Sequence, residues 1–277
     1  MECGADADSS TAALPARGGE GRLPEKIRKQ RAFYAQFAPK RFQSLLKIVD
    51  GLPKDAMILD FGCGSGRNTY ALLDLGYENV YGFDIKDYVQ LRSPADRSRF
   101  RTRLQPDGRL PYDDATFDLV ISDQVFEHVL DQVSVFRELH RITKPGGRHF
   151  HIIPSPYRLV EPHVRVLFGG MIVRPAWYRL WARLGFRQAD SHDVTAKEAA
   201  ERAIVYYHSS VKYVSSAAYK VIWRRTGFDY RFVDQEYFDT HWRAALRAVG
   251  KLNRIVPIFG WLHRVFRVRH VLLTRQA

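Results

Sequence analysis

Cysteine is scarce in this sequence of 277 residues, which holds only Cys3 and Cys63. The two lie far apart, so the close spacing of a disulfide framework or a zinc site is absent. Scarce cysteine fits a reducing cytoplasm. Long apolar runs are also missing, since no segment approaches the roughly 18 apolar residues that a transmembrane helix requires. We therefore expect a cytoplasmic protein without a structural disulfide, a metal site or a membrane-spanning segment.

Residues 1–22 lack the apolar core of a secretory signal and are rich in Ala, Gly, Ser and Asp. Such a composition cannot bury enough apolar surface to fold, so we expect a disordered tail. Over the whole chain 45% of residues are hydrophobic and 26% are charged, which is typical of a globular protein with a full core. We expect residues 23–277 to form a single domain.

Acidic residues are missing from the C-terminal end. Residues 240–277 contain eight Lys or Arg and no Asp or Glu, within a net charge of +13. This excess can attract nucleic acid, anionic lipid or an acidic substrate, or it can simply keep the protein in solution. Within it, residues 251–269 mix basic and large apolar side chains and can make a peripheral contact with an anionic membrane. The alternative, favoured because Pro257 and Gly260 interrupt an amphipathic helix, is a helical cover of the sheet with a solvated basic face.

Short apolar runs alternate with helical patterns along most of the chain. The predicted strands are 56–60, 80–84, 100–104, 117–122, 149–153, 228–234 and 266–274. This alternation predicts an α/β protein with a doubly wound, mainly parallel sheet. Residues 154–214 break the rhythm and contain nine aromatic residues, so we expect a lid insertion that faces the substrate. Within it, Trp177, Tyr178 and Trp181 have helical spacing, which favours core packing over a pocket lining.

The first strand ends in a glycine-rich loop, ILDFGCGSGR, in which Gly62, Gly64 and Gly66 follow Asp60. A dinucleotide-binding loop needs a glycine where Arg67 stands, and a phosphate-binding loop needs a Gly-Lys-Ser/Thr ending. Neither pattern is met. A tight turn without a ligand is the simplest alternative, but three glycines in alternation favour close approach of a small molecule to the backbone.

A second acidic residue, Asp84, stands at the tip of the next predicted strand. A carboxylate in that place can accept hydrogen bonds from both hydroxyls of a ribose. The glycine loop and the helix after it can offer backbone N–H groups to a small carboxylate. A ligand with a ribose, an amine and a carboxylate describes S-adenosylmethionine better than a pyrophosphate.

Four motifs occur in a fixed order, namely ILDFGCGSG, VYGFD, LPYDDATFDLVISDQVFEHV and LHRITKPGGRHFHII. In this order the sequence resembles the small-molecule branch of the class I S-adenosylmethionine-dependent methyltransferases, over roughly 31–153 and again in the last two strands. The resemblance implies a Rossmann-like sheet of seven strands whose last strand runs antiparallel. It also implies that the glycine loop lies under the methionine end of the cofactor.

The same resemblance implies further roles around the cofactor. Asp84 would bind the ribose and Ile85 would pack on the adenine. Asp123 and Gln124 would line the other side of the cofactor. Asp107, one residue nearer to the Leu-Pro-Tyr motif than is usual in the family, is the candidate for the adenine amino group.

Methyl transfer to a hydroxyl needs a base, and histidine is the usual one near neutral pH. His128 follows Glu127 in a stretch similar to quinone-ring O-methyltransferases, which hold magnesium with Glu-x-x-Glu-His. Because Gln124 occupies the first acidic position here, we predict no metal, and packing near the cofactor loop is the alternative for His128. His151 lies within a strand and is expected to be structural.

A second candidate base, His163, lies on the segment that leaves the fifth predicted strand. Glu161 is close enough in sequence to orient it, and Tyr157 can position a substrate. The alternative is a loop stiffened by three prolines, in which His163 only packs.

The sequence thus predicts an S-adenosylmethionine-dependent methyltransferase that acts on oxygen of a small-molecule, sugar or lipid-linked acceptor. The basic excess allows an RNA methyltransferase as an alternative, although SDQV stands where base-methylating enzymes often carry Asn/Asp-Pro-Pro-Tyr/Phe. An inactive, methyltransferase-like partner protein is a third hypothesis, and the complete cofactor motifs argue against it. The sequence does not distinguish between acceptors.

Overall fold

The computed structural model describes residues 47–49, 51–188 and 191–276. All of them belong to one compact unit, Phe37–Ala277. The tail expected over residues 1–22 lies outside the described residues.

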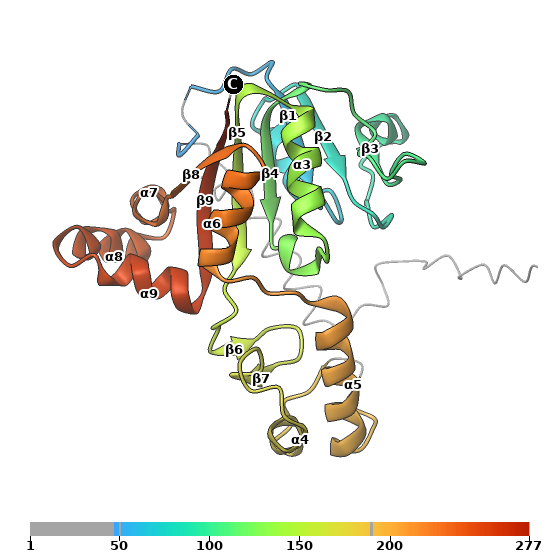
Figure 1. The fold of residues 1–277 in the computed structure, drawn as a ribbon, viewed down its shortest axis with the longest axis vertical. Coiled ribbons are helices and arrows are strands. Elements are labelled where there is room, and N and C mark those ends of the chain that lie inside the picture. The colour runs from blue at the N-terminus through green and yellow to red at the C-terminus, as the bar shows by residue number, and fades with distance from the viewer. Residues whose placement is uncertain (1–46, 50, 189–190, 277) are drawn as a thin grey trace, which may run out of the picture. The chain divides into compact units, whose positions relative to one another are not determined.

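A seven-stranded sheet organises this unit, in the order β3-β2-β1-β4-β5-β9-β8 (Figure 1). The strands are β1 (Met57–Phe61), β2 (Asn79–Phe83), β3 (Phe100–Arg101), β4 (Phe117–Asp123), β5 (Thr143–Pro154), β8 (Phe228–Phe232) and β9 (Val268–Arg275). The first five pair in parallel, whereas β9 runs antiparallel to both β5 and β8. The predicted doubly wound α/β sheet with an antiparallel last strand is confirmed.

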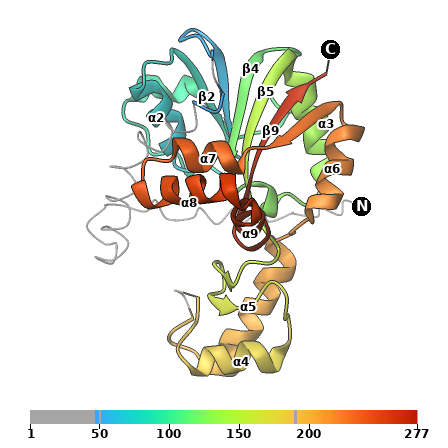
Figure 2. The same ribbon diagram turned by 90° about the vertical axis from the view of Figure 1, so that its left-hand side faces the viewer.

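Helices cover both faces of the sheet (Figure 2). They are α2 (Arg67–Asp74) and α7 (Asp234–Thr240) on one face, and α3 (Gln132–Ile142) and α6 (Ser216–Arg225) on the other, with a short 3₁₀ helix, η2 (Pro94–Arg99), before β3. A hydrophobic core lies on each face of the sheet, and successive strand residues pack into different cores. Ile58 packs with Leu72 of α2 on one face. Its neighbour Leu59 lies on the other face, in the cluster that holds Phe136 of α3 and Trp223 of α6. The period of two in a strand sends successive side chains to opposite faces.

Some predicted elements differ from the observed ones. The third strand, predicted over 100–104, is two residues long. Directly after β4 the chain forms a single 3₁₀ turn, η3 (Phe126–His128). The fifth strand, predicted over 149–153, begins at Thr143, so residues 144–147 lie inside β5, where Gly146 has φ 73° and the register against β4 shifts. A glycine with positive φ lets the strand bend there without ending.

The insertion at 154–214 has its own small core. It contains β6 (Val160–Glu161), β7 (Val166–Leu167), α4 (Pro175–Arg183) and α5 (Ala196–Ser210). Tyr178 of α4 is buried against Ala200 and Ala203 of α5, and its hydroxyl donates to the carbonyl of Gly169 over 2.7 Å. Trp177 and Trp181 pack on the same cluster, which confirms core packing for these aromatic residues.

The basic C-terminal region forms two helices, α8 (Ala244–Ile255) and α9 (Ile258–Phe266), separated at Pro257. They follow α7 and lead into β9. Among the helices that the structure describes, none is both long and apolar enough to cross a membrane.

Candidate active site

The glycine loop after β1 has three glycines with positive φ, and they serve different purposes. A side chain at Gly62 (φ 75°) would overlap Val125, and one at Gly66 (φ 79°) would lie 3.1 Å from the ring of Phe100. At Gly64 (φ 52°) a Cβ atom would meet nothing within 4 Å. Gly62 and Gly66 are therefore required by packing, whereas Gly64 leaves open space above bare backbone.

Asp84, directly after β2, ties this loop to the neighbouring strand. Its Oδ2 accepts from the N–H of Gly64 over 2.9 Å, and its Oδ1 accepts from the N–H of Lys86 over 3.0 Å. A carboxylate has about four acceptor sites, so both oxygens can receive further donors. Asp84 thus lies beside the open space at Gly64 with acceptor capacity left.

Asp60 at the head of the motif is fully buried. Its Oδ2 accepts from the N–H of Thr69 (3.0 Å) and from the hydroxyl of the same residue (2.8 Å), which fastens the first turn of α2 to the end of β1. Its Oδ1 has no hydrogen-bond partner among the described residues. Burial raises the pKa of Asp60 to about 7, although the hydrogen bonds from Thr69 oppose this.

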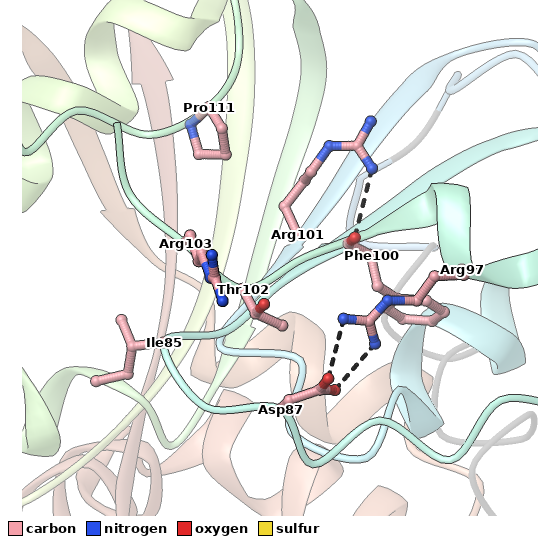
Figure 3. Close-up of a pocket in the computed structure, with 8 residues that line it drawn as sticks. All are labelled: Ile85, Asp87, Arg97, Phe100, Arg101, Thr102, Arg103 and Pro111. Carbon is pink, nitrogen blue, oxygen red and sulfur yellow. Dashed lines mark hydrogen bonds and ion pairs between the residues drawn. The ribbon is translucent and has the colours of Figure 1, made fainter. Parts of the chain in front are cut away.

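A pocket of about 690 Å³ opens next to the end of β2 (Figure 3). Ile85 is one of its lining residues and is 69% exposed. Asp87 and Arg97, paired over 2.9 Å, and Phe100 line another part of it. The pocket thus offers an apolar surface one residue beyond Asp84.

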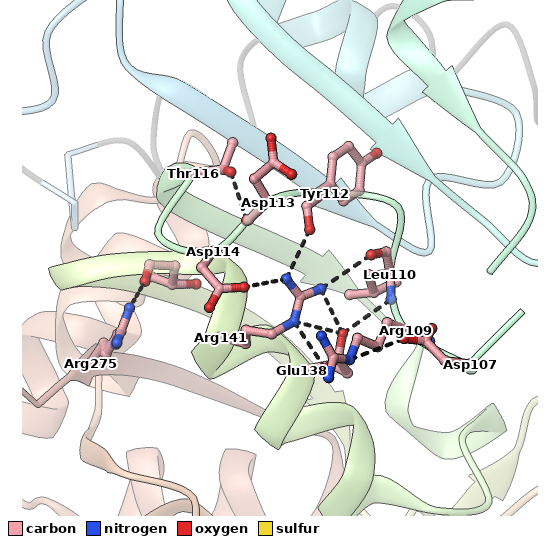
Figure 4. Close-up of polar contacts among 11 residues, drawn as sticks. Asp107, Arg109, Leu110, Tyr112, Asp113, Asp114, Thr116, Glu138, Arg141 and Arg275 are labelled. Atoms are coloured by element: carbon pink, nitrogen blue, oxygen red, sulfur yellow. Dashed lines mark hydrogen bonds and ion pairs between the residues drawn. The ribbon is translucent and has the colours of Figure 1, made fainter. Parts of the chain in front are cut away.

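Asp107 has a local role in the turn before Leu110 (Figure 4). Its Oδ1 accepts from the N–H of Arg109 over 3.0 Å, and its Oδ2 pairs with Nε of Arg109 over 3.3 Å. It is not one of the residues that line the pocket beside Ile85. A contact of Asp107 with an adenine amino group stays a prediction, beside this simpler role in the turn.

Asp123 and Gln124 lie at the carboxyl end of β4, next to the glycine loop. Asp123 is half-buried, and Gln124 has φ 57°, which is uncommon for a residue other than glycine. The N–H of Gln124 donates to Ile152 over 2.9 Å, and its Oε1 accepts from Nη1 of Arg158 over 3.3 Å. This strained residue therefore links the sheet edge to the start of the insertion.

Glu161, His163 and Tyr213 form a compact hydrogen-bonded group. Oε1 of Glu161 lies 2.6 Å from Nδ1 of His163 and 2.6 Å from the hydroxyl of Tyr213, while Oε2 accepts from the N–H of Val164 over 2.8 Å. Burial by itself raises the pKa of Glu161, but the hydrogen bonds from His163 and Tyr213 outweigh it and lower the pKa. The carboxylate is therefore charged at neutral pH and holds Nδ1 of His163 as a donor.

His128 and Glu127 complete the cluster on the η3 turn. The rings of His128 and His163 are 5.0 Å apart between centroids and nearly perpendicular. Nδ1 of His128 lies 2.8 Å from the carbonyl of Ser210, and burial lowers the pKa of this histidine. Glu127 is buried, and burial raises its pKa to about 7. Its Oε2 has no hydrogen-bond partner in the described part of the chain.

The remaining candidates lie apart from this cluster. Tyr157 is 44% exposed, and its backbone N–H donates to Oγ of Ser155. His151 is fully buried, with Nδ1 2.8 Å from Oγ of Ser122 and Nε2 3.2 Å from His149. Burial lowers the pKa of His151 to about 3, so it stays neutral. The structural role predicted for His151 is confirmed.

Comparison with known proteins adds to this geometry. Residues 59–151 match the family model of a methyltransferase domain. The chain is 31% identical over 120 residues to 27-O-demethylrifamycin SV methyltransferase of Amycolatopsis mediterranei. This match covers 39% of this chain and 44% of that protein. The chain is 37% identical over 101 residues to the ubiquinone biosynthesis O-methyltransferase of Pseudomonas aeruginosa, covering 34% and 42%. Both matches span less than half of the relative's length.

Among solved structures, geranyl diphosphate C-methyltransferase from Streptomyces coelicolor A3(2), in complex with Mg²⁺, geranyl diphosphate and S-adenosyl-L-homocysteine, has a TM-score of 0.51. The alignment covers 94% of this chain and 86% of that one at 17% identity, so the likeness concerns the fold alone. Residues 59–151 thus form a methyltransferase domain, and the chain has the fold of the class I S-adenosylmethionine-dependent methyltransferases. This confirms the predicted family, and S-adenosylmethionine is the cofactor of these enzymes.

The residues of this methyltransferase domain fit the cofactor at three points. Open space above Gly64 leaves room for its methionine end beside bare backbone. Asp84 offers acceptors to the ribose, and the exposed Ile85 offers an apolar surface to the adenine. Each assignment of a contact stays a prediction, but nothing in the local packing opposes it.

Among the residues that the structure describes, two groups of side chains have the donor atoms for a metal ion. Glu127, His128 and His163 each offer one atom within 4.8 Å of the others. The second group, Asp234, His263 and His270, meets the same limit near β9. There, Oδ2 of Asp234 is already paired with Nε of Arg264 over 2.7 Å, and that guanidinium supplies a positive charge to the carboxylate.

Sequence reasoning missed three residues of the site. Tyr213 reaches Glu161 across 52 positions of the chain. Arg269 of β9 is 1% exposed and donates to the carbonyls of Pro154 and Val214, so it joins the two ends of the insertion. Thr69 was also missed. The contacts of Tyr213 and Arg269 depend on how distant segments meet, so no local pattern marks them, whereas Thr69 lies only nine positions after its partner Asp60.

Proposed function

We propose that this protein transfers a methyl group from S-adenosylmethionine to a hydroxyl oxygen of a small-molecule, sugar or lipid-linked acceptor. The observation that carries the proposal is the 2.6 Å contact between Nδ1 of His163 and Oε1 of Glu161. This pair belongs to the insertion that leaves the carboxyl end of β5, the sheet edge at which the glycine loop and Asp84 also lie. A histidine oriented by a carboxylate is a suitable base for a hydroxyl.

The protein's own part in the reaction is to orient the acceptor, hold its proton and exclude water. With Nδ1 donating to Glu161, the lone pair of the neutral His163 ring lies on Nε2, where it can accept the acceptor's hydroxyl proton. The negative charge of Glu161 stabilises the imidazolium that results, and Tyr213 holds the same carboxylate oxygen in place. When bound, the cofactor supplies a methyl group activated by its positive sulfonium.

The names of two relatives support oxygen as the accepting atom. Both 27-O-demethylrifamycin SV methyltransferase and the ubiquinone biosynthesis O-methyltransferase are named for methylation at oxygen. Each match covers less than half of the relative, so the acceptor of this protein is proposed by class only. No described contact favours RNA as the acceptor.

Turnover with cofactor labelled on the methyl group tests the proposal. The purified protein is incubated with labelled S-adenosylmethionine and, in separate reactions, with phenolic compounds, sugars, a lipid extract and total RNA. We expect label in an ether of one hydroxyl compound and at least a hundredfold less with His163→Ala. Label in RNA, label bonded to nitrogen or carbon, or no label with any acceptor would each contradict the proposal.

A further inference from the structure

The surface of α8 and α9 exposes large apolar side chains in close succession. The exposed fractions are 44% for Leu252, 78% for Ile255, 45% for Val256, 49% for Ile258 and 52% for Trp261. All five lie within ten consecutive positions on either side of the break at Pro257. The two helices pack against each other, since the N–H of Gly260 donates to Oδ1 of Asn253 over 2.6 Å. We refer to these five exposed side chains of the two packed helices together as the α8–α9 patch.

The α8 helix has two outward stripes besides its packed side. Gly250 and Asn253 are buried toward α7, where Asn253 donates to Gln235 over 2.7 Å. Leu252 and Ile255, three positions apart, share the exposed apolar stripe. Arg247, Lys251 and Arg254 follow at spacings of four and three, which places them on an adjacent basic stripe. An apolar stripe flanked by Lys and Arg is the pattern of a helix that lies in a membrane interface.

The charge around the patch is of one sign. Residues 240–277 contain no Asp or Glu. Two acidic residues of α7 are paired with arginines of these helices: Asp239 with Arg254 over 2.9 Å, and Asp234 with Arg264 over 2.7 Å. Lys251 and Arg267 are both exposed. An anionic surface that approaches α8 and α9 therefore meets basic side chains and no acidic residue of these two helices.

The α8–α9 patch also lies near the edge of the sheet that carries the active site. The α9 helix leads into Val268, which pairs with Pro154 at the carboxyl end of β5. The N–H of Ser155 donates to the carbonyl of Arg267 over 3.0 Å. Figures 1 and 2 show α9 beside the start of β9, close to the point where the insertion leaves the sheet. The insertion that begins there carries Glu161 and His163.

We propose that the α8–α9 patch docks on an anionic lipid membrane, with Ile255 and Trp261 entering the interface and the basic side chains meeting the headgroups. A nucleic acid would also attract the basic residues, but it gives no reason to expose five large apolar side chains together. This contact does not depend on the proposed methyl transfer. If both hold, the acceptor is a molecule carried in the membrane.

Vesicle flotation with the full chain tests the proposal. The probes are vesicles of phosphatidylcholine alone and vesicles with equal parts of phosphatidylglycerol. We expect the protein to float with the anionic vesicles at low salt, and with neither kind at 0.5 M NaCl because salt screens the headgroup attraction. A wild-type protein that stays unbound with anionic vesicles at low salt overturns the proposal.

Two double variants separate the apolar from the basic contribution. Ile255→Ser with Trp261→Ser removes the inserting side chains and should weaken binding at least about tenfold. Lys251→Gln with Arg267→Gln should weaken it by roughly fivefold for each charge removed. The matched control, Val205→Ser with Val221→Ser, changes two apolar residues that are 66% and 49% exposed elsewhere and should leave binding unchanged.

Circular dichroism and thermal unfolding of each variant establish that it is folded. If the Ile255/Trp261 variant is folded and binds like the wild type while the charge variant does not, the surface recognises polyanions and the membrane proposal is wrong. An equal loss in the Val205/Val221 control overturns it as well. Methyl transfer to a water-soluble hydroxyl compound is measured in parallel, so failure of membrane binding and failure of the proposed activity are seen separately.

Discussion

His163 and Glu161 face each other at 2.6 Å, Nδ1 to Oε1, with Glu161 at the end of β6 and His163 two positions later on the loop that leads to β7. The carboxylate is buried and holds a second short hydrogen bond from Tyr213, whereas His163 keeps part of its ring exposed. A buried charge is stable only when donors surround it, so the pair is oriented before any acceptor arrives.

Changing either partner of this pair should lower turnover without weakening cofactor binding. We expect His163→Ala to reduce kcat by about 10²–10⁴-fold because it removes the base. Glu161→Gln should reduce it less and shift the pH profile, since the imidazolium loses its counter-charge. Tyr213→Phe, which removes one hydrogen bond, should cost about 0.5–1.5 kcal/mol, or a few-fold in kcat. Calorimetry with S-adenosylhomocysteine is the control, and equal losses of affinity in all three variants would assign them to cofactor binding instead.

Asp84 should matter for the cofactor far more than an exposed carboxylate elsewhere does. Asp84→Ala removes an acceptor predicted for the ribose and also frees the N–H of Gly64, so we expect affinity for S-adenosylhomocysteine to fall by about 1–3 kcal/mol per lost hydrogen bond. Asp74→Ala, which breaks an exposed ion pair with Arg92 and does not line the pocket beside Ile85, is the matched control. Calorimetry that finds the two variants alike would contradict the ribose assignment.

Two glycines allow a test in which backbone strain is held constant. Gly64 (φ 52°) and Gly76 (φ 84°) both have positive φ and open space for a methyl group, but only Gly64 belongs to the cofactor loop. Replacing either with alanine should destabilise the fold by about 1–2 kcal/mol through the left-handed backbone. Only Gly64→Ala should also weaken S-adenosylhomocysteine binding, by about tenfold or more. If Gly64→Ala binds as tightly as Gly76→Ala, the cofactor does not approach the loop at that point.

Stability should depend on pH through Glu127. Burial raises its pKa to about 7 in the folded protein from 4.5, so the folded state holds a proton that the unfolded state has lost. The wild type therefore loses stability as pH rises from about 4.5 to about 7. Glu127→Gln lacks this loss and should gain roughly 3 kcal/mol relative to the wild type over that window. Urea unfolding at pH 5 and pH 8, with EDTA present, measures the free energy of unfolding of both proteins. A difference between wild type and Glu127→Gln that is the same at both pH values would contradict the raised pKa.

Chelation distinguishes a histidine base from a metal centre. Because His163 acts through an unliganded nitrogen, dialysis against EDTA should leave activity within about twofold, and added Zn²⁺ should inhibit by occupying His128 and His163. Activity that disappears with EDTA and returns with Mg²⁺ or Zn²⁺ would instead make Glu127, His128 and His163 a functional metal site.

The sequence predicts much of this fold because its signals are local. Alternating strand and helix patterns, the glycines after Asp60 and the acidic residue at 84 each occupy a few consecutive positions. The structure confirms the order of the elements and brings the glycine loop and Asp84 together at the carboxyl ends of β1 and β2. Most strand limits differ from the predicted ones by one or two residues, but β3 ends three residues earlier and β5 begins six residues earlier than predicted. Hydrogen bonding across the sheet sets where a strand begins and ends.

What the sequence determined by itself is the family, the order of the elements and the pair Glu161–His163 as one of several candidates. Only the tertiary structure brought Tyr213 to Glu161 and Ser210 to His128, and only it left Ile255 and Trp261 exposed on α8 and α9. The reason is physical: a hydrogen bond between residues 52 positions apart, or the exposure of an apolar side chain, depends on how whole segments pack, and no short stretch of sequence encodes that by itself.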